Sequence, residues 1–381
     1  LNIAADKIRL VMNDTSKAPV GGPAGGSRSQ LVVGNAIRVA CETLIEAMKK
    51  PGGGFYTYDE MKAEGREVRQ YGKWTTPCTS PDENGQGEPF CCYMYGLFMA
   101  EVAVDITTGK TAVEKLTMIA DIGKVNNRLV TDGQLYGGLA QGIGLALTED
   151  YEDIKKHSTL IGAGLPYIKD VPDDIELIYL ENSRKDGPFG ASGVGELPLT
   201  APHAAIINAI YQACGARVRH LPARPEKVLA ALKIQELASS GMPFKKVVRE
   251  VEQFIYQMQT LFVLESLDNL RKNGRLTKLQ AVVTGALRIK LLMGATPQGE
   301  ICKLGQALSM KQALNKLVER IAADPAHKGR TVAICHCGCL DRAFQVKHRI
   351  EETCQAGKIL ILEAGGITTV YANEGGIVVA Y

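Results

Sequence analysis

The chain has 381 residues, of which 45% are hydrophobic and 22% are charged, and its formal net charge is +3. This composition is typical of a globular protein of two or three domains, and it excludes a general affinity for polyanions such as nucleic acid. No apolar stretch is long enough to span a bilayer and no signal peptide is visible, so the ten cysteines are expected to be reduced thiols in the cytoplasm.

Apolar periodicity in the first 233 residues predicts helices and one β-hairpin. A Gly/Pro/Ser-rich segment at 21–27 precedes the first helix, which Ser27 or Ser29 can cap, whereas residues 51–90 look irregular. Small residues on one face of the helix predicted at 133–147 indicate that this helix packs closely against a neighbour. The predicted helices cover 31–49, 133–147, 202–213 and 224–233, and the predicted hairpin covers 99–119 with its turn at 107–110.

Helices alternate with short strands in the last 148 or so residues, which is an α/β layer pattern. No polar linker precedes this part, and residues 229–237 could form one continuous helix. The predicted helices cover 244–261, 310–322 and 345–354, and the predicted strands cover 331–335, 359–363 and 376–381.

The most informative segment is the glycine-rich loop at 190–196, Gly-Ala-Ser-Gly-Val-Gly-Glu. Glycines at this density let backbone N–H groups approach a bulky ligand without an intervening Cβ. A single acid in such a loop, Glu196, is a candidate general base. The alternative is a tight loop with a solvated glutamate. A capping role for Glu196 is disfavoured because Thr200 is the better N-cap for a helix with Pro202 in its first turn.

A second glycine loop, Gly-Gly-Pro-Ala-Gly-Gly-Ser-Arg at 21–28, opens onto the first helix. Free N–H groups and the helix dipole make such a loop a ready anion site. The alternative is an ordinary capped helix after a linker, and the residues alone favour this alternative.

Three cysteines alternate in the segment Cys335-His336-Cys337-Gly338-Cys339. Zinc sites usually pair two C-x-x-C motifs, whereas here only Cys354 follows. On a strand the three thiols would share one face. We therefore interpret the segment as a strand end with buried thiols rather than as a metal site.

Residues 1–233 resemble the molybdenum hydroxylases of the xanthine oxidase family. More narrowly, they resemble the C-terminal part of the aldehyde oxidoreductases that carry molybdopterin cytosine dinucleotide. The motifs that carry the likeness are Gly-Gly-Pro-Ala-Gly-Gly-Ser-Arg at 21–28, Tyr-Met-Tyr-Gly at 93–96, Asp-Gly-Gln-Leu-Tyr-Gly-Gly at 132–138, Gly-Ala-Ser-Gly-Val-Gly-Glu-Leu-Pro-Leu-Thr at 190–200 and Ala-Ala-Ile-Ile-Asn-Ala-Ile at 204–210.

This resemblance implies oxidation of aldehydes to carboxylic acids with water as the oxygen source. Glu196 would be the catalytic base, near molybdenum without being a firm ligand, and would take the proton from a hydroxide on the metal. The cofactor would be molybdenum with molybdopterin cytosine dinucleotide. The residues implied to approach it are Ala24, Gly25, Gly26, Ser27, Asn127, Arg128, Leu129, Val130, Thr131, Gln134, Gly193, Val194 and Gly195.

The resemblance leaves the activity of this polypeptide open. The family builds its cofactor cleft from earlier segments too, and these are not in the chain. The iron–sulfur domains that accept the electrons are also absent, and the cysteines at 78, 91 and 92 do not match the four-cysteine spacing of an iron–sulfur site.

Residues 234–381 resemble a different family, the C-terminal half of a DegV-type fatty-acid-binding protein. The matching segments are Phe-Val-Leu-Glu-Ser-Leu-Asp-Asn-Leu-Arg-Lys-Asn-Gly-Arg-Leu at 262–276, Lys-Leu-Gly-Gln-Ala at 303–307 and Tyr-Ala-Asn-Glu-Gly-Gly at 371–376. This resemblance implies a lobe that holds a fatty acid, with Arg275 and Tyr371 as candidate lipid contacts. The contacts to the fatty-acid carboxylate would come largely from the N-terminal lobe, which is missing.

We therefore expect a mixed α/β and α+β protein. A fragment of a molybdenum-hydroxylase C-terminal domain at 1–233 would be followed by a DegV-like α/β lobe at 234–381. The first residue is Leu, which fits a fragment. The first functional hypothesis is an aldehyde-oxidising hydroxylase fragment. The alternatives are a fatty-acid-binding module and a fusion artefact with no function as a unit.

Overall fold

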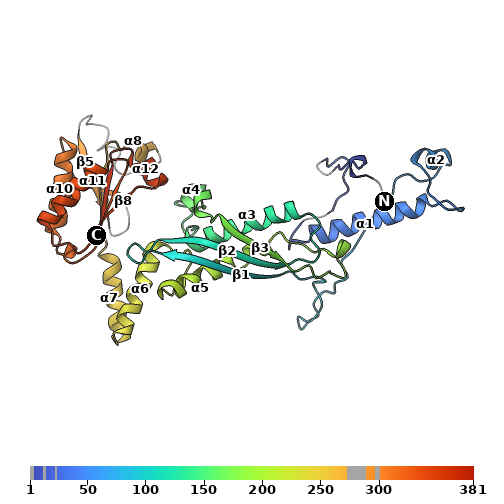
Figure 1. Ribbon diagram of the computed structural model, residues 1–381, viewed down its shortest axis with the longest axis horizontal. Helices are drawn as coiled ribbons and strands as arrows, with labels where there is room; N and C mark the ends of the chain where they lie inside the picture. The colour runs from blue at the N-terminus through green and yellow to red at the C-terminus, as the bar shows by residue number, and fades with distance from the viewer. Residues whose placement is uncertain (1–3, 12–13, 22–23, 273–288, 297–300) are drawn as a thin grey trace. The chain divides into compact units, whose positions relative to one another are not determined.

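Helices and strands are mixed throughout the protein, as the sequence predicts (Figure 1). The chain divides into two compact units, Leu1–Leu232 and Lys233–Tyr381. Within the described part of the chain, no helix is both long and apolar enough to cross a membrane. The structure, a computed structural model, describes residues 4–11, 14–21, 24–272, 289–296 and 301–381.

The first unit is built on a three-stranded sheet. Strands β1 (Tyr95–Val104) and β2 (Thr111–Asp121) pair antiparallel, and β3 (Asp174–Tyr179) runs parallel to β2. The turn between β1 and β2 closes through Gly109, whose φ of +75° favours glycine and whose N–H donates to the carbonyl of Asp105. The predicted hairpin is confirmed, whereas β3 was not predicted.

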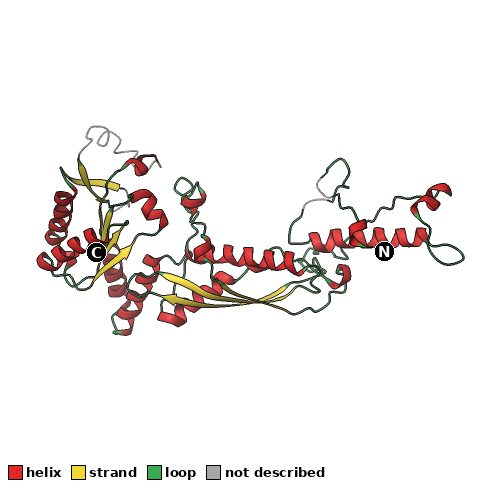
Figure 2. Ribbon diagram, turned by 45° about the horizontal axis from the view of Figure 1, so that its top comes forward, coloured by secondary structure: helices red, strands yellow, loops and turns green. Residues whose placement is uncertain are grey.

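Helices α3 (Arg128–Leu147) and α5 (Pro202–Cys214) bury their apolar sides against this sheet (Figure 2). The close packing predicted for α3 is confirmed, because a Cβ at Gly138 would overlap Pro198 and one at Gly142 would overlap Pro202. The largest fully buried side chains of this core are Leu116, Met118, Leu135, Leu139, Ile143, Ile206 and Ile210.

Two helix starts differ from the predictions. Helix α1 (Ser29–Met48) has Arg28 as its N-cap and no capping side chain, so neither Ser27 nor Ser29 caps it. Helix α3 begins five residues before its predicted start because Asn127 accepts a hydrogen bond from Val130 N–H and caps it. The shorter helices of this unit are η1 (Ala5–Lys7), α2 (Tyr58–Ala63), α4 (Leu160–Ala163), η2 (Ile168–Asp170), η3 (Pro188–Gly190) and η4 (Leu197–Leu199).

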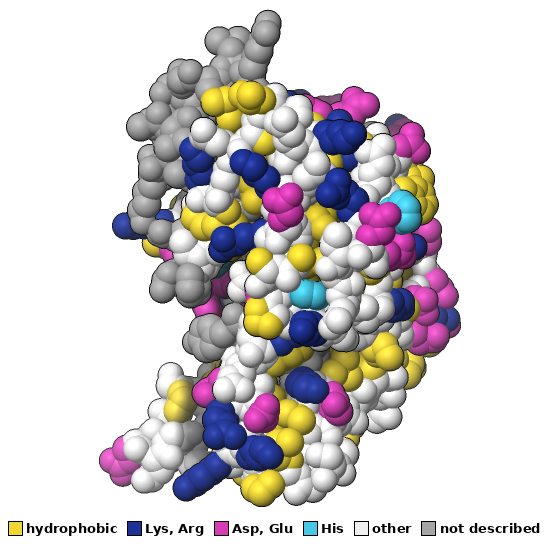
Figure 3. All heavy atoms as spheres, turned by 90° about the vertical axis from the view of Figure 1, so that its left-hand side faces the viewer, with side chains coloured by type: hydrophobic (Ala, Val, Ile, Leu, Met, Phe, Trp, Pro, Cys, Tyr) yellow, Lys and Arg dark blue, Asp and Glu magenta, His cyan; other side chains and the backbone are white. Residues whose placement is uncertain are grey.

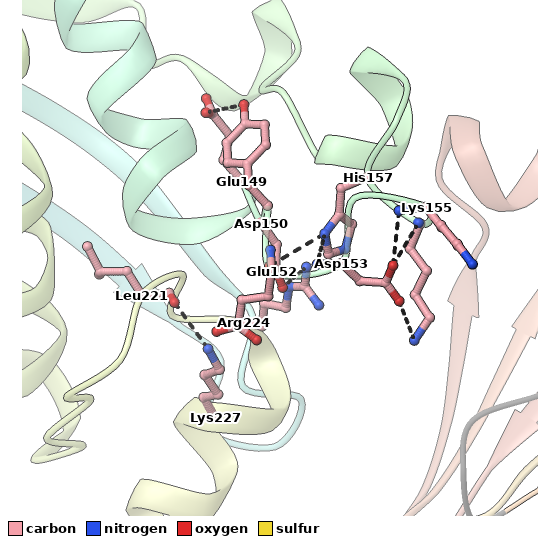
Figure 4. Close-up of polar contacts among 11 residues, drawn as sticks. Glu149, Asp150, Glu152, Asp153, Lys155, His157, Leu221, Arg224 and Lys227 are labelled. Atoms are coloured by element: carbon pink, nitrogen blue, oxygen red, sulfur yellow. Dashed lines mark hydrogen bonds and ion pairs between the residues drawn. The ribbon is translucent and has the colours of Figure 1, made fainter.

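A polar cluster fixes the start of α6 (Pro225–Ser239) (Figure 4). One carboxylate oxygen of Asp150 lies 2.8 Å from Arg224 Nη2, and the other lies 3.7 Å from His157 Nδ1. The backbone N–H of Glu152, assisted by the Arg224 charge, lowers the pKa of Asp150. Helix α6 confirms the helix predicted at 224–233. It continues to Ser239, as the apolar pattern across residues 229–237 indicated.

The second unit contains a six-stranded sheet in the order β6-β5-β4-β9-β7-β8. Strands β7 and β8 pair parallel, and the other neighbouring pairs are antiparallel. The strands are β4 (Thr260–Val263), β5 (Lys290–Ala295), β6 (Ile301–Ala307), β7 (Val332–His336), β8 (Ile359–Glu363) and β9 (Ile377–Ala380).

Helices α10 (Met310–Ala323) and α11 (Leu340–Thr353) complete the main core of this unit, and α8 (Asp268–Lys272) and α12 (Gly366–Ala372) pack against each other. Helix α7 (Phe244–Tyr256) ends earlier than predicted, because Leu261 pairs into β4 instead. A short 3-10 turn, η5 (Pro325–His327), follows α10.

The surface carries charges of both signs. On the face drawn in Figure 3, lysine and arginine side chains alternate with acidic and hydrophobic ones. The mixture agrees with the small net charge of +3.

Candidate functional site

Two glycine-rich segments that lie far apart in the sequence meet at Ser27 and Glu196. The Ser27 hydroxyl donates to Glu196 Oε2 at 2.7 Å, and the backbone N–H of Glu196 donates to Ser27 Oγ at 2.8 Å. Glu196 is exposed, whereas Ser27 is half-buried. The carboxylate is therefore oriented by one serine while it stays open to solvent.

The backbone at Ser27 is strained. Its φ of +58° lies in the left-handed region that disfavours residues with a Cβ, and Gly26 before it has a φ of +65°. The two hydrogen bonds with Glu196 hold this conformation in place. Strain of this kind tends to gather at functional sites.

The glycines of the loop at 190–196 serve contacts within the protein. A Cβ at Gly193 would overlap the Ser27 carbonyl oxygen. The carbonyl of Gly195 accepts a hydrogen bond of 2.8 Å from Gln134 Nε2, which brings a third predicted residue to the loop. Val194 is half-buried and packs against the core of the first unit.

The loop at 24–27 leaves room for a ligand. Ala24, Gly25 and Gly26 are exposed, and a Cβ at either glycine would meet no atom within 4 Å. A cavity of about 200 Å³ lies beside this loop and reaches Ser192 and Gly193.

The segment Asn127–Thr131 forms the first turn of α3. Leu129 and Val130 are 83% and 66% exposed, so two apolar side chains stand in solvent beside the helix N-terminus. Arg128 is paired with Asp132 at 2.8 Å, and Thr131 is half-buried. The contacts of this turn are local to α3 and its neighbouring strand.

An ion pair that the sequence did not reveal anchors the loop. Asp121, at the end of β2, lies 2.9 Å from Arg184 Nη2, and both side chains are largely buried. The backbone N–H of Arg184 donates to the carbonyl of Gly190, and Ser192 donates to the carbonyl of Ile122. The 63 residues that separate Asp121 from Arg184 leave no local sequence signal for this contact.

Burial raises the pKa of Asp121, but hydrogen bonds from Asn182 and from the Gly123 N–H, with the Arg184 charge, bring it below its usual value. The carboxylate therefore stays ionised and holds the strand end against the loop.

The residues after the loop differ from the prediction. Ala201 is the N-cap of α5 and makes no side-chain capping bond. Thr200, the predicted cap, donates its hydroxyl to the carbonyl of Leu197 at 2.7 Å instead. Helix α5 begins at Pro202, as predicted, and only its cap differs.

Of the two predicted lipid contacts, Arg275 lies outside the described residues. Tyr371 lies on α12, is half-buried, and packs against a small apolar cluster. The cluster contains Leu264, Leu270, Met293, Cys337 and Ala372.

The cysteine-rich segment forms a strand end, as interpreted from the sequence. Cys335 belongs to β7, Cys337 follows it, and Cys339 is the N-cap of α11, so the three do not share one strand face. Burial raises the pKa of each of the three thiols. Within the described ranges, no group of three or more histidine, cysteine or acidic side chains is arranged to hold a metal ion.

The two parts of the chain match different families of known proteins. Residues 1–172 match the molybdopterin cofactor-binding domain family, and residues 225–381 match the DegV family, described as uncharacterised. The aldehyde oxidoreductase of Megalodesulfovibrio gigas is 59% identical over 237 residues, which are 61% of this chain and 26% of that protein. A DegV domain-containing protein of Streptococcus pyogenes serotype M3 is 30% identical over 161 residues, which are 42% of this chain and 57% of that protein.

A solved structure supports the first assignment. The aldehyde oxidoreductase of Desulfovibrio desulfuricans is 73% identical with a TM-score of 0.58, and the match covers 59% of this chain and 25% of that one. The chain thus spans about a quarter of the length of the aldehyde oxidoreductases that it matches. Its N-terminal part matches the molybdopterin-binding domain of aldehyde oxidoreductase, and its C-terminal part matches the DegV family.

Proposed function

We propose that residues 1–233 form one edge of the molybdenum site of an aldehyde-oxidising hydroxylase, with Glu196 as its general base. The observation that carries this proposal is the pairing of Glu196 with Ser27, which joins the two glycine loops. The 59% identity to an aldehyde oxidoreductase supports it. When bound, the molybdenum cofactor would supply the redox centre for hydroxylation with water as the oxygen source.

The described residues fit an edge of such a cofactor. The backbone at Gly25 and Gly26 is open enough for a ligand to approach it closely, and the dipole of α3 favours a phosphate group near the helix N-terminus. The exposed Leu129 and Val130 offer apolar contact area. The cavity of about 200 Å³ is smaller than the ~300–1,000 Å³ of ordinary ligand sites. A dinucleotide therefore needs further polypeptide to enclose it.

In this proposal Glu196 accepts the proton released as the water-derived oxygen is added to the aldehyde carbon. Ser27 keeps one carboxylate oxygen in a fixed direction, and Gln134 fixes the backbone next to it through Gly195. We propose that the residues at 24–27 and 127–131 hold the cofactor, which takes the cytosine dinucleotide form in this interpretation.

The test uses a complete enzyme, because this chain matches only a quarter of one. Residues 1–233 would replace the matching part of the Megalodesulfovibrio gigas aldehyde oxidoreductase. Glu196→Gln is expected to keep the molybdenum content and to lower turnover by ~10²–10⁴-fold, since the amide cannot accept a proton. Glu101→Gln, at an exposed position on β1, is the matched control and should leave both unchanged. Parent-like turnover of the Glu196→Gln enzyme at full molybdenum content would refute the base assignment.

For residues 234–381 we propose an incomplete lipid-binding lobe. The observation that favours it is the packing of Tyr371 against the apolar cluster around Leu264 and Met293. A fatty acid held without partners for its carboxylate is poorly bound, because a buried unpaired charge is costly. Solvent extraction of the purified full chain, followed by mass spectrometry, should therefore find fatty acid well below one molecule per chain. A stoichiometric amount would contradict the proposal.

A further inference from the structure

Strand β1 has one free edge. It pairs with β2 on one side only, and no hydrogen bond from elsewhere in the described part of the chain reaches the backbone of residues 95–104. The regular pairing with β2 covers residues 95–101, and a bulge follows. Because the N–H and C=O groups of an antiparallel strand point alternately to its two sides, those on the outer side of β1 are available to a further strand.

The composition of this edge is unusual for a strand that faces water. Natural edge strands are commonly short or carry charged side chains or proline, which discourage pairing with other chains. Residues 95–100, Tyr-Gly-Leu-Phe-Met-Ala, contain no charge and no proline, and Tyr95, Leu97 and Met99 are 61%, 51% and 48% exposed. The other edge strand, β3, is shorter and carries two exposed acidic side chains. The edge of β1 is therefore suited to being covered by polypeptide.

A cavity of about 510 Å³ lies along the edge of β1. Helix α5 lines its other side with one stripe of residues at helical spacing, Ala205, Asn208, Ala209 and Gln212. The two alanines are half-buried and the two amides are exposed. The cavity thus has a strand backbone on one side and small or amide side chains on the other, and this combination fits an extended segment that adds to a sheet edge.

We propose that the edge of β1 binds one extended segment from the rest of an aldehyde oxidoreductase. This segment would pair with residues 95–101 as a fourth strand and lie against α5. The occupant follows from the comparison with the Desulfovibrio desulfuricans enzyme, which is 73% identical although the match covers only 25% of that chain. Most of such an enzyme therefore lies outside the match and can supply the strand. The inference rests on the proposed place of residues 1–233 in such an enzyme and not on the role of Glu196.

Amide hydrogen exchange, followed by mass spectrometry, measures whether the outer N–H groups of β1 are paired. The full chain is compared with the chimeric enzyme in which residues 1–233 replace the matching part of the Megalodesulfovibrio gigas protein. In the full chain about half of the amides at 95–101 should exchange rapidly, because every second N–H points to the free edge. In the chimera these amides should exchange ~100-fold more slowly. Strand β2 should be protected in both samples and reports that each is folded.

Two variants of the chimera separate the cavity from the rest of α5. Ala209→Gln places a long side chain in the cavity and should return the outer amides of β1 to rapid exchange. Ala204→Gln, at an exposed position of the same helix that does not line the cavity, should leave them protected. If the chimera fails to fold, the native Megalodesulfovibrio gigas enzyme provides the same measurement at the segment that matches residues 95–101.

Two results would overturn the proposal. The first is equal exchange of the outer β1 amides in the full chain and in the folded enzyme. The second is a dimer of the full chain, detected by light scattering, in which these amides are already protected, because a second copy would then be the occupant. Turnover is measured separately. An inactive chimera with a protected β1 would count against the base assignment alone, whereas an active chimera with an unprotected β1 would count against this inference alone.

Discussion

Ser27 is the residue on which the candidate site depends most directly. Its hydroxyl both donates to the Glu196 carboxylate and accepts from the Glu196 backbone, so a single side chain fixes the direction of the proposed base. The left-handed φ of +58° shows that the surrounding chain imposes this position against the preference of the residue. Hydrogen bonding and backbone strain therefore act in opposite directions at Ser27, and substitutions can separate them.

Ser27→Ala should lower the free energy of unfolding by about 0.5–1.5 kcal/mol, because it removes the hydrogen bonds and keeps the strain. The free energy of unfolding of the Ser27→Gly variant should lie closer to that of the parent. Glycine also removes the hydrogen bonds, but it relieves about 1 kcal/mol of left-handed strain. Urea unfolding measures both, and Ser29→Ala, at an exposed neighbouring position, is the control. If Ser27→Gly were the less stable of the two, the strain argument would be wrong.

Asp121 gives the site a dependence on pH. Its pKa is lowered in the folded protein, so its stabilising effect is complete above the unfolded value and is lost as the pH falls through the folded one. Asp121→Asn should cost about 1–3 kcal/mol near pH 7, because it leaves the Arg184 guanidinium without its charged partner.

The difference between the Asp121→Asn variant and the parent should shrink below about pH 4, where the parent carboxylate also becomes protonated. Thermal unfolding across a pH series measures this difference. Glu114→Gln, at an exposed position on the same strand, serves as the matched control. A difference that stays constant down to pH 2 would contradict the role given to the charge.

At the scale of the elements, helix α3 shows how glycines on different sides of one helix have opposite effects. Gly142 faces Pro202 so closely that a Cβ would overlap the ring, whereas a Cβ at Gly137 would meet no atom within 4 Å. The first glycine is therefore needed for packing, and the second only lowers helix propensity.

Gly142→Ala should consequently destabilise the protein by about 1–3 kcal/mol through overpacking. Gly137→Ala should stabilise it by about 0.5–1 kcal/mol through helix propensity, so each variant is the control for the other. Chemical denaturation of the two variants tests the pair. Equal effects of one sign would show that α5 and its proline are not held against α3 as the structure has them.

Local patterns explain which elements the sequence could predict. Helices with an apolar stripe, such as α1 and α10, agree with their predicted bounds within two residues. The hairpin with its glycine turn is also predicted, although β1 begins four residues before the predicted start. Strand β3 was not predicted, although Ile175, Leu177 and Tyr179 alternate in it with exposed residues. The end of α7 was misplaced because Leu261 is held by strand pairing, which a helical pattern does not reveal.

In the candidate site, too, the sequence reveals the local features and not the contacts between distant residues. The glycine loops and Glu196 stand out in the sequence because their composition is unusual. The contacts that join them, Ser27 to Glu196 and Asp121 to Arg184, span 169 and 63 residues and have no local signature. Tertiary packing decides these contacts, so residue spacing alone could not predict them.

At the scale of the whole molecule, two unrelated family matches lie in one chain. We propose that the boundary near residue 233 separates two independently folding parts. Each part has its own buried cluster, one around Leu116 and Ile206 and the other around Leu317 and Ile334. Reading intact genomic DNA across codons 225–245 would show whether a single frame encodes both.

Independent folding can be tested with one core substitution in each part. Ile206 and Ile334 are both fully buried, so replacing either with alanine should cost about 2–5 kcal/mol. The single tryptophan, Trp74, lies in the first part, so its fluorescence follows that part, while far-ultraviolet circular dichroism follows both. Ile206→Ala should move the fluorescence transition to lower denaturant. Ile334→Ala should leave that transition in place and move only a second component of the dichroism signal. If both substitutions shifted one common transition by the same amount, the two parts would fold as a single cooperative unit and the proposed boundary would be wrong.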